Sequence, residues 1–292
     1  MNDFDILIKQ TEDRWLEILY SHINELYTKN PLPSHNEEHA LRVWKYSVQL
    51  TGHLWAKGFK IDPADIDNLI ITIFFHDTGL FFTRGIEHGK AGSLLCKNWL
   101  ESQSFLNKVD SEKILHAILN HDNKSYINNI PLVKNGEINL LSILSISDDL
   151  DAYGFIGIYR YIEIYLLRGT QMEELGQQVL SNAGLRFKNF LEQCEMFPAL
   201  VKLHTKRYLI VEKFFKQYNS RILKDPKGEK YSFGPYSIAR FIHNQLLNMN
   251  FSVIKLCEAG IKESKNSYNR TFFIKLRDEW TLIKQKANHK GE

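Results

Sequence analysis

Histidine is concentrated in one part of this sequence. Of the 11 histidines, seven lie between His35 and His121. One of them stands in a His76-Asp77 pair, and a cluster of aspartates begins at Asp148. Imidazole nitrogen and carboxylate oxygen suit Mn, Fe, Zn, Co or Ni better than a soft metal, which would favour thiolate ligands. The sequence therefore predicts a divalent-metal site built from histidine and aspartate.

The His76-Asp77 pair is the most informative part of this set. It follows the apolar run 69–75. Adjacent side chains point in different directions along a regular helix, so both can face one centre only where the helix ends. Thr78-Gly79 is a suitable end. A buried carboxylate at this position is costly without a partner, and a bound cation is one such partner.

Helices must position these residues, because the apolar spacing is helical almost throughout the chain. Asp62-Pro63 is typical of a helix start, with a capping carboxylate followed by proline at the first helical position. The helix that begins there reaches His76. Further helices are predicted over about 110–121 and 138–152, and we find no convincing strand pair. The predicted fold class is all-α.

Composition excludes several classes of protein. The 292 residues are 43% apolar and 24% charged, with a net charge of +3, which is too apolar for a disordered chain. The three cysteines are far apart, which argues against a disulfide framework or a zinc ribbon and fits a reducing compartment. No signal peptide and no apolar run of about 20 residues is present, so we expect a soluble, cytoplasmic protein with no membrane partner.

A shift in charge divides the chain near residue 220. Residues 221–292 hold 14 Lys or Arg against 7 Asp or Glu. We therefore predict a metal-binding helical domain over 1–220 and a basic helical appendage over 221–292. The basic charges form no run and no nucleic-acid motif, which makes nucleic acid an unfavoured partner. A solvated surface, a helical lid or a homodimer contact explains them better.

Five short motifs follow one another along the chain. They are His39-Ala-Leu-Arg42-Val43, His76-Asp77-Thr-Gly79, Glu87-His88-Gly-Lys-Ala-Gly92, Ile118-Leu-Asn-His121 and Asp148-Asp-Leu-Asp151-Ala-Tyr-Gly154. Each motif is weak alone, but their order resembles the HD-domain metal-dependent phosphohydrolase superfamily. The later segments Arg186–Phe190 and Lys206–Phe215 resemble its bacterial hydrolase branch. The resemblance covers roughly residues 30–220. It implies an HD-type helical bundle, here followed by the small helical appendage.

The resemblance also implies a ligand set and a reaction. Two metal positions would share one aspartate, and one or two divalent ions (Mn, Fe, Zn, Co, Ni or Mg) would activate water to attack a phosphate ester or anhydride. The implied substrate is a phosphorylated small molecule, and we expect a nucleotide. The first position would use His39, His76, Asp77 and Asp148, and the second would use Asp77, His88 and His121. Carboxylates that could orient the histidines are Asp122, Asp149 and Asp151.

Two further residues are candidates for catalysis beside Asp77. His35-Asn36-x-x-His39-Ala40 resembles the HNxxHA run of cyclic-nucleotide phosphodiesterases, in which the first histidine protonates the leaving oxygen. The alternative is that Ser34 or His35 only caps the helix. Lys90 stands two residues after His88 and could meet a phosphate, or it could be a solvated surface lysine.

Two other functions fit the same residues. Mixed-valent di-iron oxygenases of the same superfamily use four histidines and two aspartates in this order and oxidise small polyols or phosphonates. A non-catalytic HD-type sensor or binding module would keep the metal site without turnover. Ligand residues alone do not separate these chemistries.

Overall fold

The computed structural model describes residues 2–29, 32–83, 85, 87–103, 109–123, 131–223, 233–247 and 252–288, with the backbone alone at residues 29 and 283–288. The chain divides into two compact units, Met1–Asp151 and Ala152–Glu292. The described residues are nearly all helical, which confirms the predicted fold class. None of the described helices is long and apolar enough to cross a membrane.

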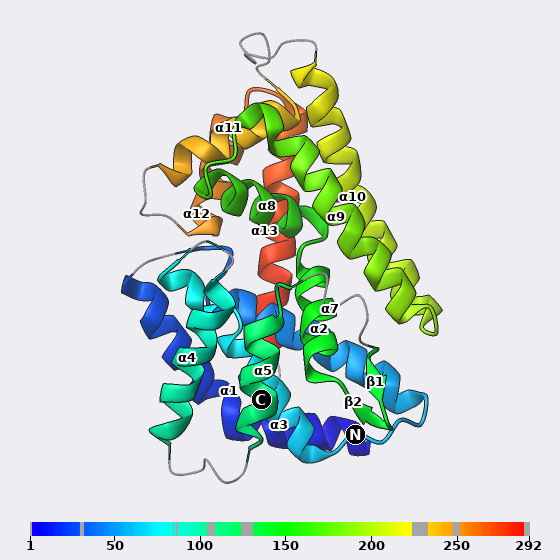
Figure 1. Cartoon of the computed structure of the whole chain (residues 1–292). Helices are drawn as coiled ribbons and strands as arrows, with labels where there is room; N and C mark the ends of the chain where they lie inside the picture. Colours follow the sequence, from blue (N-terminus) through cyan, green and yellow to red (C-terminus); the bar gives the residue numbers. More distant parts are fainter. Residues whose placement is uncertain are drawn as a thin grey trace. The chain divides into compact units, whose positions relative to one another are not determined.

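The described residues of the first unit form seven helical segments and a short hairpin (Figure 1). They are α1 (Asp3–Lys29), α2 (Glu37–Ala56), α3 (Pro63–Phe75), the 3₁₀ helix η1 (Thr78–Phe81), α4 (His88–Glu101), α5 (Ser111–Asn120), β1 (Val133–Lys134), β2 (Glu137–Ile138) and α7 (Leu140–Asp151).

Helix α3 lies at the centre of this unit. Ten of its 13 residues are buried, and it contacts α1, α2, α5 and α7. A helix that is apolar on nearly every face is stable only when other elements surround it. Its start follows the predicted pattern, because the Asp62 carboxylate accepts a hydrogen bond from the Ala64 amide (2.9 Å) and Pro63 follows the cap. The chain leaves α3 at His76, in the interior of the unit.

Helices α2 and α7 pack along each other. Asn36 caps α2, since its side chain accepts hydrogen bonds from the amides of Glu38 and His39. The alternative in which Ser34 or His35 caps this helix is therefore wrong. Every residue of α7 is buried. The pairing brings the first turn of α2 to the last turns of α7.

The hairpin was not predicted. Strands β1 and β2 pair antiparallel, with Val133 opposite Ile138 and Lys134 opposite Glu137. Asn135 and Gly136 form the turn with φ of 55° and 84°. An Asn-Gly pair is a strong signal for such a turn, but two-residue strands are too short to show an alternating pattern.

The described part of the second unit forms six further helices. They are α8 (Gly154–Leu167), α9 (Met172–Cys194), α10 (Pro198–Ile222), α11 (Pro235–Leu246), α12 (Val253–Glu263) and α13 (Ser267–Asn288). One hydrophobic core joins them, from Ala152 to Trp280. The division between compact units therefore differs from the predicted boundary at residue 220, because the helices of 221–292 share their core with α8, α9 and α10.

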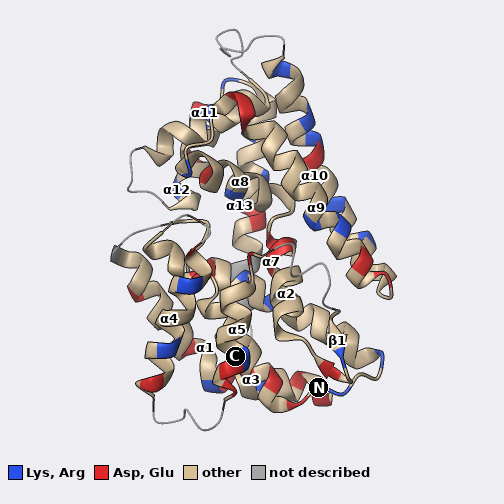
Figure 2. Cartoon of the chain, in the orientation of Figure 1, with Lys and Arg blue, Asp and Glu red and all other residues tan. Residues whose placement is uncertain are grey.

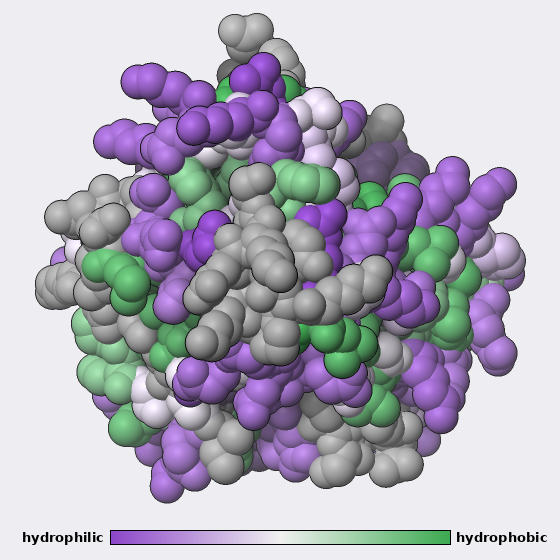
Figure 3. All heavy atoms as spheres, turned by 90° about the horizontal axis from the view of Figure 1, so that it is seen from above, coloured by the Kyte–Doolittle hydropathy of each residue, from purple (hydrophilic) through white to green (hydrophobic). Residues whose placement is uncertain are grey.

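Charge is dispersed over the second unit. Figure 2 shows Lys and Arg interleaved with Asp and Glu on α9 and α10. Ion pairs one helical turn apart join Lys188 to Glu192 (3.7 Å) and Lys216 to Glu212 (2.9 Å). On the face that Figure 3 shows, hydrophobic residues form separate patches among hydrophilic ones. Interleaved charges and small apolar patches are typical of a protein surface that faces water. The expectations about nucleic acid, membrane and a homodimer stay predictions.

Candidate metal centre

The end of α3 places two adjacent side chains at one centre, as the sequence predicted. His76 keeps helical angles, whereas Asp77 has φ −98° and ψ 1° and begins the 3₁₀ helix η1. The Thr78 hydroxyl donates to the carbonyl of Phe75 (2.7 Å) and closes the end of α3. The change of helix type is what lets a histidine and the next residue point to the same place.

The first cluster consists of four buried residues: His39, His76, Asp77 and Asp148. His39 lies in α2, His76 and Asp77 directly follow α3, and Asp148 lies in α7. His39 Nε2 lies 3.2 Å from His76 Nε2, 3.2 Å from Asp77 Oδ2 and 3.6 Å from Asp148 Oδ1. Two ligands about 2.1 Å from one cation, at coordination angles of about 90–109°, lie about 3.0–3.4 Å apart. These separations therefore fit four ligands of one divalent ion.

The second cluster shares Asp77 and adds His88 at the start of α4 and His121 at the end of α5. Asp77 Oδ1 lies 3.3 Å from His121 Nε2 and 3.6 Å from His88 Nε2, and these two nitrogens are 3.1 Å apart. The Asp77 carboxylate therefore turns Oδ2 to the first cluster and Oδ1 to the second. This is the arrangement of a bridging ligand.

The tautomers of the four histidines fit metal binding. Three of them direct Nδ1 to the backbone carbonyl three residues earlier, and His39 directs it to the Asp151 carboxylate. A carbonyl only accepts hydrogen bonds, so Nδ1 carries the proton and Nε2 keeps a lone pair facing the centre. The pairs are His76 with Ile73 (2.6 Å), His88 with Gly85 (2.7 Å), His121 with Ile118 (2.7 Å) and His39 with Asp151 Oδ2 (2.8 Å).

Converging lone pairs need a positive charge between them. Nitrogen lone pairs 3.1–3.2 Å apart, beside two carboxylates, repel one another unless a cation or protons lie among them. All six side chains are buried, so bulk water compensates little of this repulsion. The donor set of four imidazoles and two carboxylates therefore fits divalent metal ions.

The electrostatics of the centre keep its shared carboxylate charged. Burial by itself would raise the pKa of Asp77, but when the neighbouring imidazoles are protonated, the charge of His76 and hydrogen bonds from His121, His39 and His76 hold that pKa well below its usual range. Burial, followed by the charge of His121, lowers the pKa of His88. A charged carboxylate and a neutral imidazole are the forms that bind metal.

Asp151 orients the first ligand. It is fully buried, and its Oδ2 accepts from His39 Nδ1 while Arg42 Nε donates to Oδ1 (2.8 Å) and Oδ2 (3.1 Å). The sequence predicted this role for Asp122, Asp149 or Asp151 without choosing among them. Arg42 is buried in its ion pair with Asp151.

The two other catalytic candidates lie at different depths. His35 is buried, its Nδ1 is 2.7 Å from the Ser34 hydroxyl, and its ring centroid is 5.5 Å from that of His39. Lys90 is exposed in the first turn of α4. The structure brings His35 next to a ligand and leaves Lys90 in solvent, and the catalytic roles of both stay predictions.

Sequence reasoning missed one residue of the centre. Tyr27, fully buried near the end of α1, donates its hydroxyl hydrogen to the backbone carbonyl of Asp77 (2.9 Å). The two residues are 50 positions apart, and no local pattern marks a tyrosine for this contact. Burial, and then the charge of Asp77, raise the pKa of Tyr27 well above its usual value, so the hydroxyl keeps its proton.

Comparison with known proteins agrees with the geometry. The family model of the HD domain matches residues 36–153, a segment that includes all six candidate ligands and excludes Tyr27. This match confirms an HD domain over residues 36–153. The bacterial branch stays a prediction. No curated protein and no solved structure matched the chain.

Proposed function

We propose that this protein is a divalent-metal-dependent phosphohydrolase. The observation that carries the proposal is the division of the Asp77 carboxylate between two buried clusters, each completed by imidazole lone pairs. Within an HD domain this arrangement supports hydrolysis of a phosphate ester or anhydride. We further propose a nucleotide as the substrate, because the resemblance to the superfamily implies it.

The residues that would hold the metal ions are the six of the two clusters. When bound, such a pair of ions lowers the pKa of a water molecule and neutralises charge on phosphoryl oxygens. The protein's contribution is orientation: Asp151 and three backbone carbonyls fix the histidine tautomers, and Tyr27 fixes the backbone of the shared aspartate. Preset ligands avoid the cost of reorganisation during the reaction.

We propose that His35 donates the proton to the leaving oxygen. It lies four residues before His39, just outside the start of α2, and its ring contacts the ring of His39, so it is held beside the first cluster. The Ser34 hydroxyl at 2.7 Å holds the orientation of its ring. Lys90 would meet the charge of a substrate phosphate, since it lies two residues from His88 and is exposed.

The test is phosphate or pyrophosphate release across a panel of nucleotides with Mn²⁺. Wild-type protein is expected to release one of these products. Asp77→Ala is expected to abolish release, because both clusters lose a ligand. Asp13→Asn, at an exposed position of α1, is the matched control and should leave the rate unchanged.

Other results would favour the alternative functions. If wild-type protein releases neither phosphate nor pyrophosphate with any divalent metal, and instead contains iron and consumes oxygen, the di-iron oxygenase is supported. Metal binding without turnover of any substrate would support the sensor. Equal release by wild type and Asp77→Ala would show that the activity does not come from this centre.

A further inference from the structure

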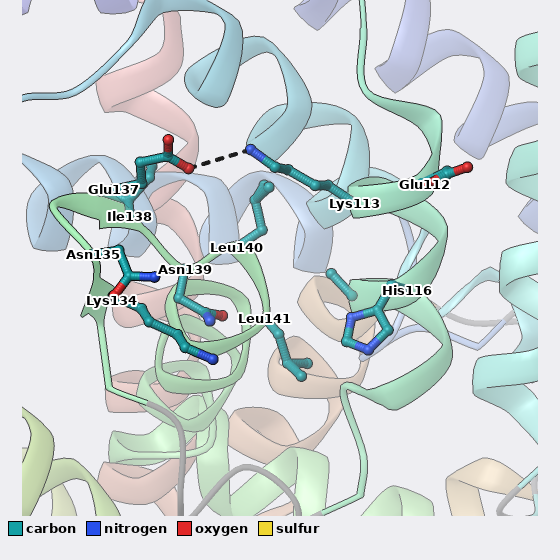
Figure 4. Close-up of a pocket in the computed structure, with 11 residues that line it drawn as sticks. Glu112, Lys113, His116, Lys134, Asn135, Glu137, Ile138, Asn139, Leu140 and Leu141 are labelled. Carbon is teal, nitrogen blue, oxygen red and sulfur yellow. Dashed lines mark ion pairs between the residues drawn. The ribbon is translucent and has the colours of Figure 1, made fainter.

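A second candidate site lies in the first unit, away from the metal centre. It is a cavity of ≈ 670 Å³ that opens to solvent between the first turns of α5, the β1–β2 hairpin and the start of α7 (Figure 4). None of the six candidate ligands lines it. Leu141 of its wall is seven residues before Asp148 on α7, about 10 Å along the helix.

The cavity presents hydrogen-bond donors on one side. Asn139 caps α7, because its Oδ1 accepts from the Ser142 amide (3.1 Å). The Asn139 amide group is therefore left to donate, and in Figure 4 it lies beside Lys134 and across from His116. Lysine, amide and imidazole together form a group that suits an anion.

The charge of Lys134 is not neutralised by its strand partner. Glu137, opposite Lys134 in the hairpin, instead pairs with Lys113 (3.6 Å), and Figure 4 shows this pair along the other side of the cavity. Glu112, the second acidic residue of the wall, points away from the cavity in the same view. Among the described residues, no ion pair involves Lys134, so its charge remains for a ligand.

Apolar side chains complete the wall. Ala117, Ile138, Leu140 and Leu141 are buried at its base. A fully hydrated inorganic anion gains nothing from such contacts, whereas an organic anion can place its apolar part on them.

We propose that this cavity binds a small organic anion, with a phosphate, phosphonate or carboxylate group at Lys134 and Asn139 and an apolar body against Leu140 and Leu141. The site is separate from the metal centre, and its occupation does not depend on the proposed hydrolase activity.

The test is calorimetric titration of the full-length protein with phenylphosphonate, an apolar ring bearing an anion that cannot be hydrolysed. Lys134→Ala removes the cation. Asn139→Asp keeps an oxygen to cap α7 and replaces the donor by a negative charge, so folding is retained. Each change is expected to raise the Kd about tenfold or more. Lys97→Ala, an exposed lysine on α4 outside the cavity, should leave the Kd unchanged.

A further variant separates this site from the metal centre. Binding that survives Asp77→Asn but is lost in Lys134→Ala and Asn139→Asp supports the cavity. Binding lost only in Asp77→Asn places the probe at the metal centre and overturns the proposal, as does the absence of any binding by wild-type protein. Methylphosphonate should bind more weakly than phenylphosphonate, and equal affinities would contradict the apolar part of the site.

Discussion

Asp77 supplies one carboxylate oxygen to each of two histidine clusters. Three features fix the position of this residue. Its backbone begins a 3₁₀ helix, its carbonyl accepts a hydrogen bond from Tyr27, and imidazoles lie on both sides of its carboxylate. A bridging ligand must satisfy two positions at once, so small displacements of its backbone affect both.

The orientation of His39 by Asp151 gives a first prediction. Asp151→Asn should lower the affinity for Mn²⁺ by about 10- to 100-fold. The neutral amide has no negative charge to keep the proton of His39 on Nδ1, so Nε2 is less firmly held as the metal-binding nitrogen. It should also destabilise the fold, since Arg42 loses its buried anionic partner. The measurement is a competition titration with a chelator. Asp67→Asn, which breaks the Arg14 ion pair of 2.7 Å in the same unit, should leave metal affinity unchanged.

Tyr27 gives a second prediction. Tyr27→Phe removes only the hydroxyl that bonds the Asp77 carbonyl, and the free energy of unfolding should fall by about 0.5–1.5 kcal/mol. The affinity for Mn²⁺ should fall with it, because the backbone of the shared ligand is less restrained. Tyr20→Phe on the same helix is the matched control. Loss of stability with unchanged metal affinity would limit Tyr27 to a packing role.

At the scale of elements, the ligands lie where helices begin or end. Asp77 follows α3, His88 begins α4 and His121 follows α5. Helix ends are also where neighbouring backbones approach closely. A Cβ on Gly79 would overlap the backbone carbonyl of His88, so glycine is required there for contact between η1 and α4. The sequence suggested a different reason for this glycine, the termination of the preceding helix.

This contact gives a third prediction. Gly79→Ala should lower the free energy of unfolding by about 1–3 kcal/mol, because backbone atoms must move apart. It should weaken the second cluster more than the first, since His88 shifts with α4. Urea unfolding and metal stoichiometry are the measurements. Gly184→Ala is the control, because a Cβ there meets only an ordinary contact, and the helix gains stability from alanine. Unchanged stability of Gly79→Ala would contradict the required contact.

Helix α1 shows where element predictions lose accuracy. By their spacing of three and four residues, Trp15, Ile18 and Leu19 would share one apolar stripe. The structure buries Trp15 and Leu19 together with Ile23 and Tyr27, and leaves Ile18 45% exposed. Periodicity indicates that a helix is amphipathic, but the neighbours α2 and α3 decide which side chains at the edge of the stripe are covered.

At the scale of the whole molecule, the metal centre belongs to one compact unit. All six candidate ligands lie within Met1–Asp151, while Ala152–Glu292 has its own hydrophobic core. Metal binding should therefore stabilise the first unit directly, by an amount that grows with the ratio of free metal to Kd.

The cysteines can test this, because Cys96 lies in the first unit, and Cys194 and Cys257 lie in the second. All three are buried, and burial raises the pKa of Cys194 and of Cys257 to about 12 and raises that of Cys96 as well. Reaction with iodoacetamide at pH 8 should therefore require opening of the fold. Removal of metal with EDTA should speed labelling of Cys96 about a hundredfold if metal was present at about 100 times its Kd.

Labelling of the other two cysteines should change little in the same experiment. Equal acceleration of all three would show that the two units open together. No acceleration of Cys96 would show that bound metal does not stabilise the first unit. Labelling in denaturant, where all three react, gives the reference.

The sequence by itself determined the helical class, the residue types and order of the candidate metal ligands, and the need for a helix end at His76-Asp77. These follow from local patterns, because spacing, caps and adjacent residues act over a few positions of the chain. Tertiary structure alone decided which Asp77 oxygen faces which cluster, that Asp151 and Tyr27 support the ligands, and where the compact units divide. Those outcomes depend on contacts between residues up to 112 positions apart, such as His39 with Asp151, which no local pattern encodes.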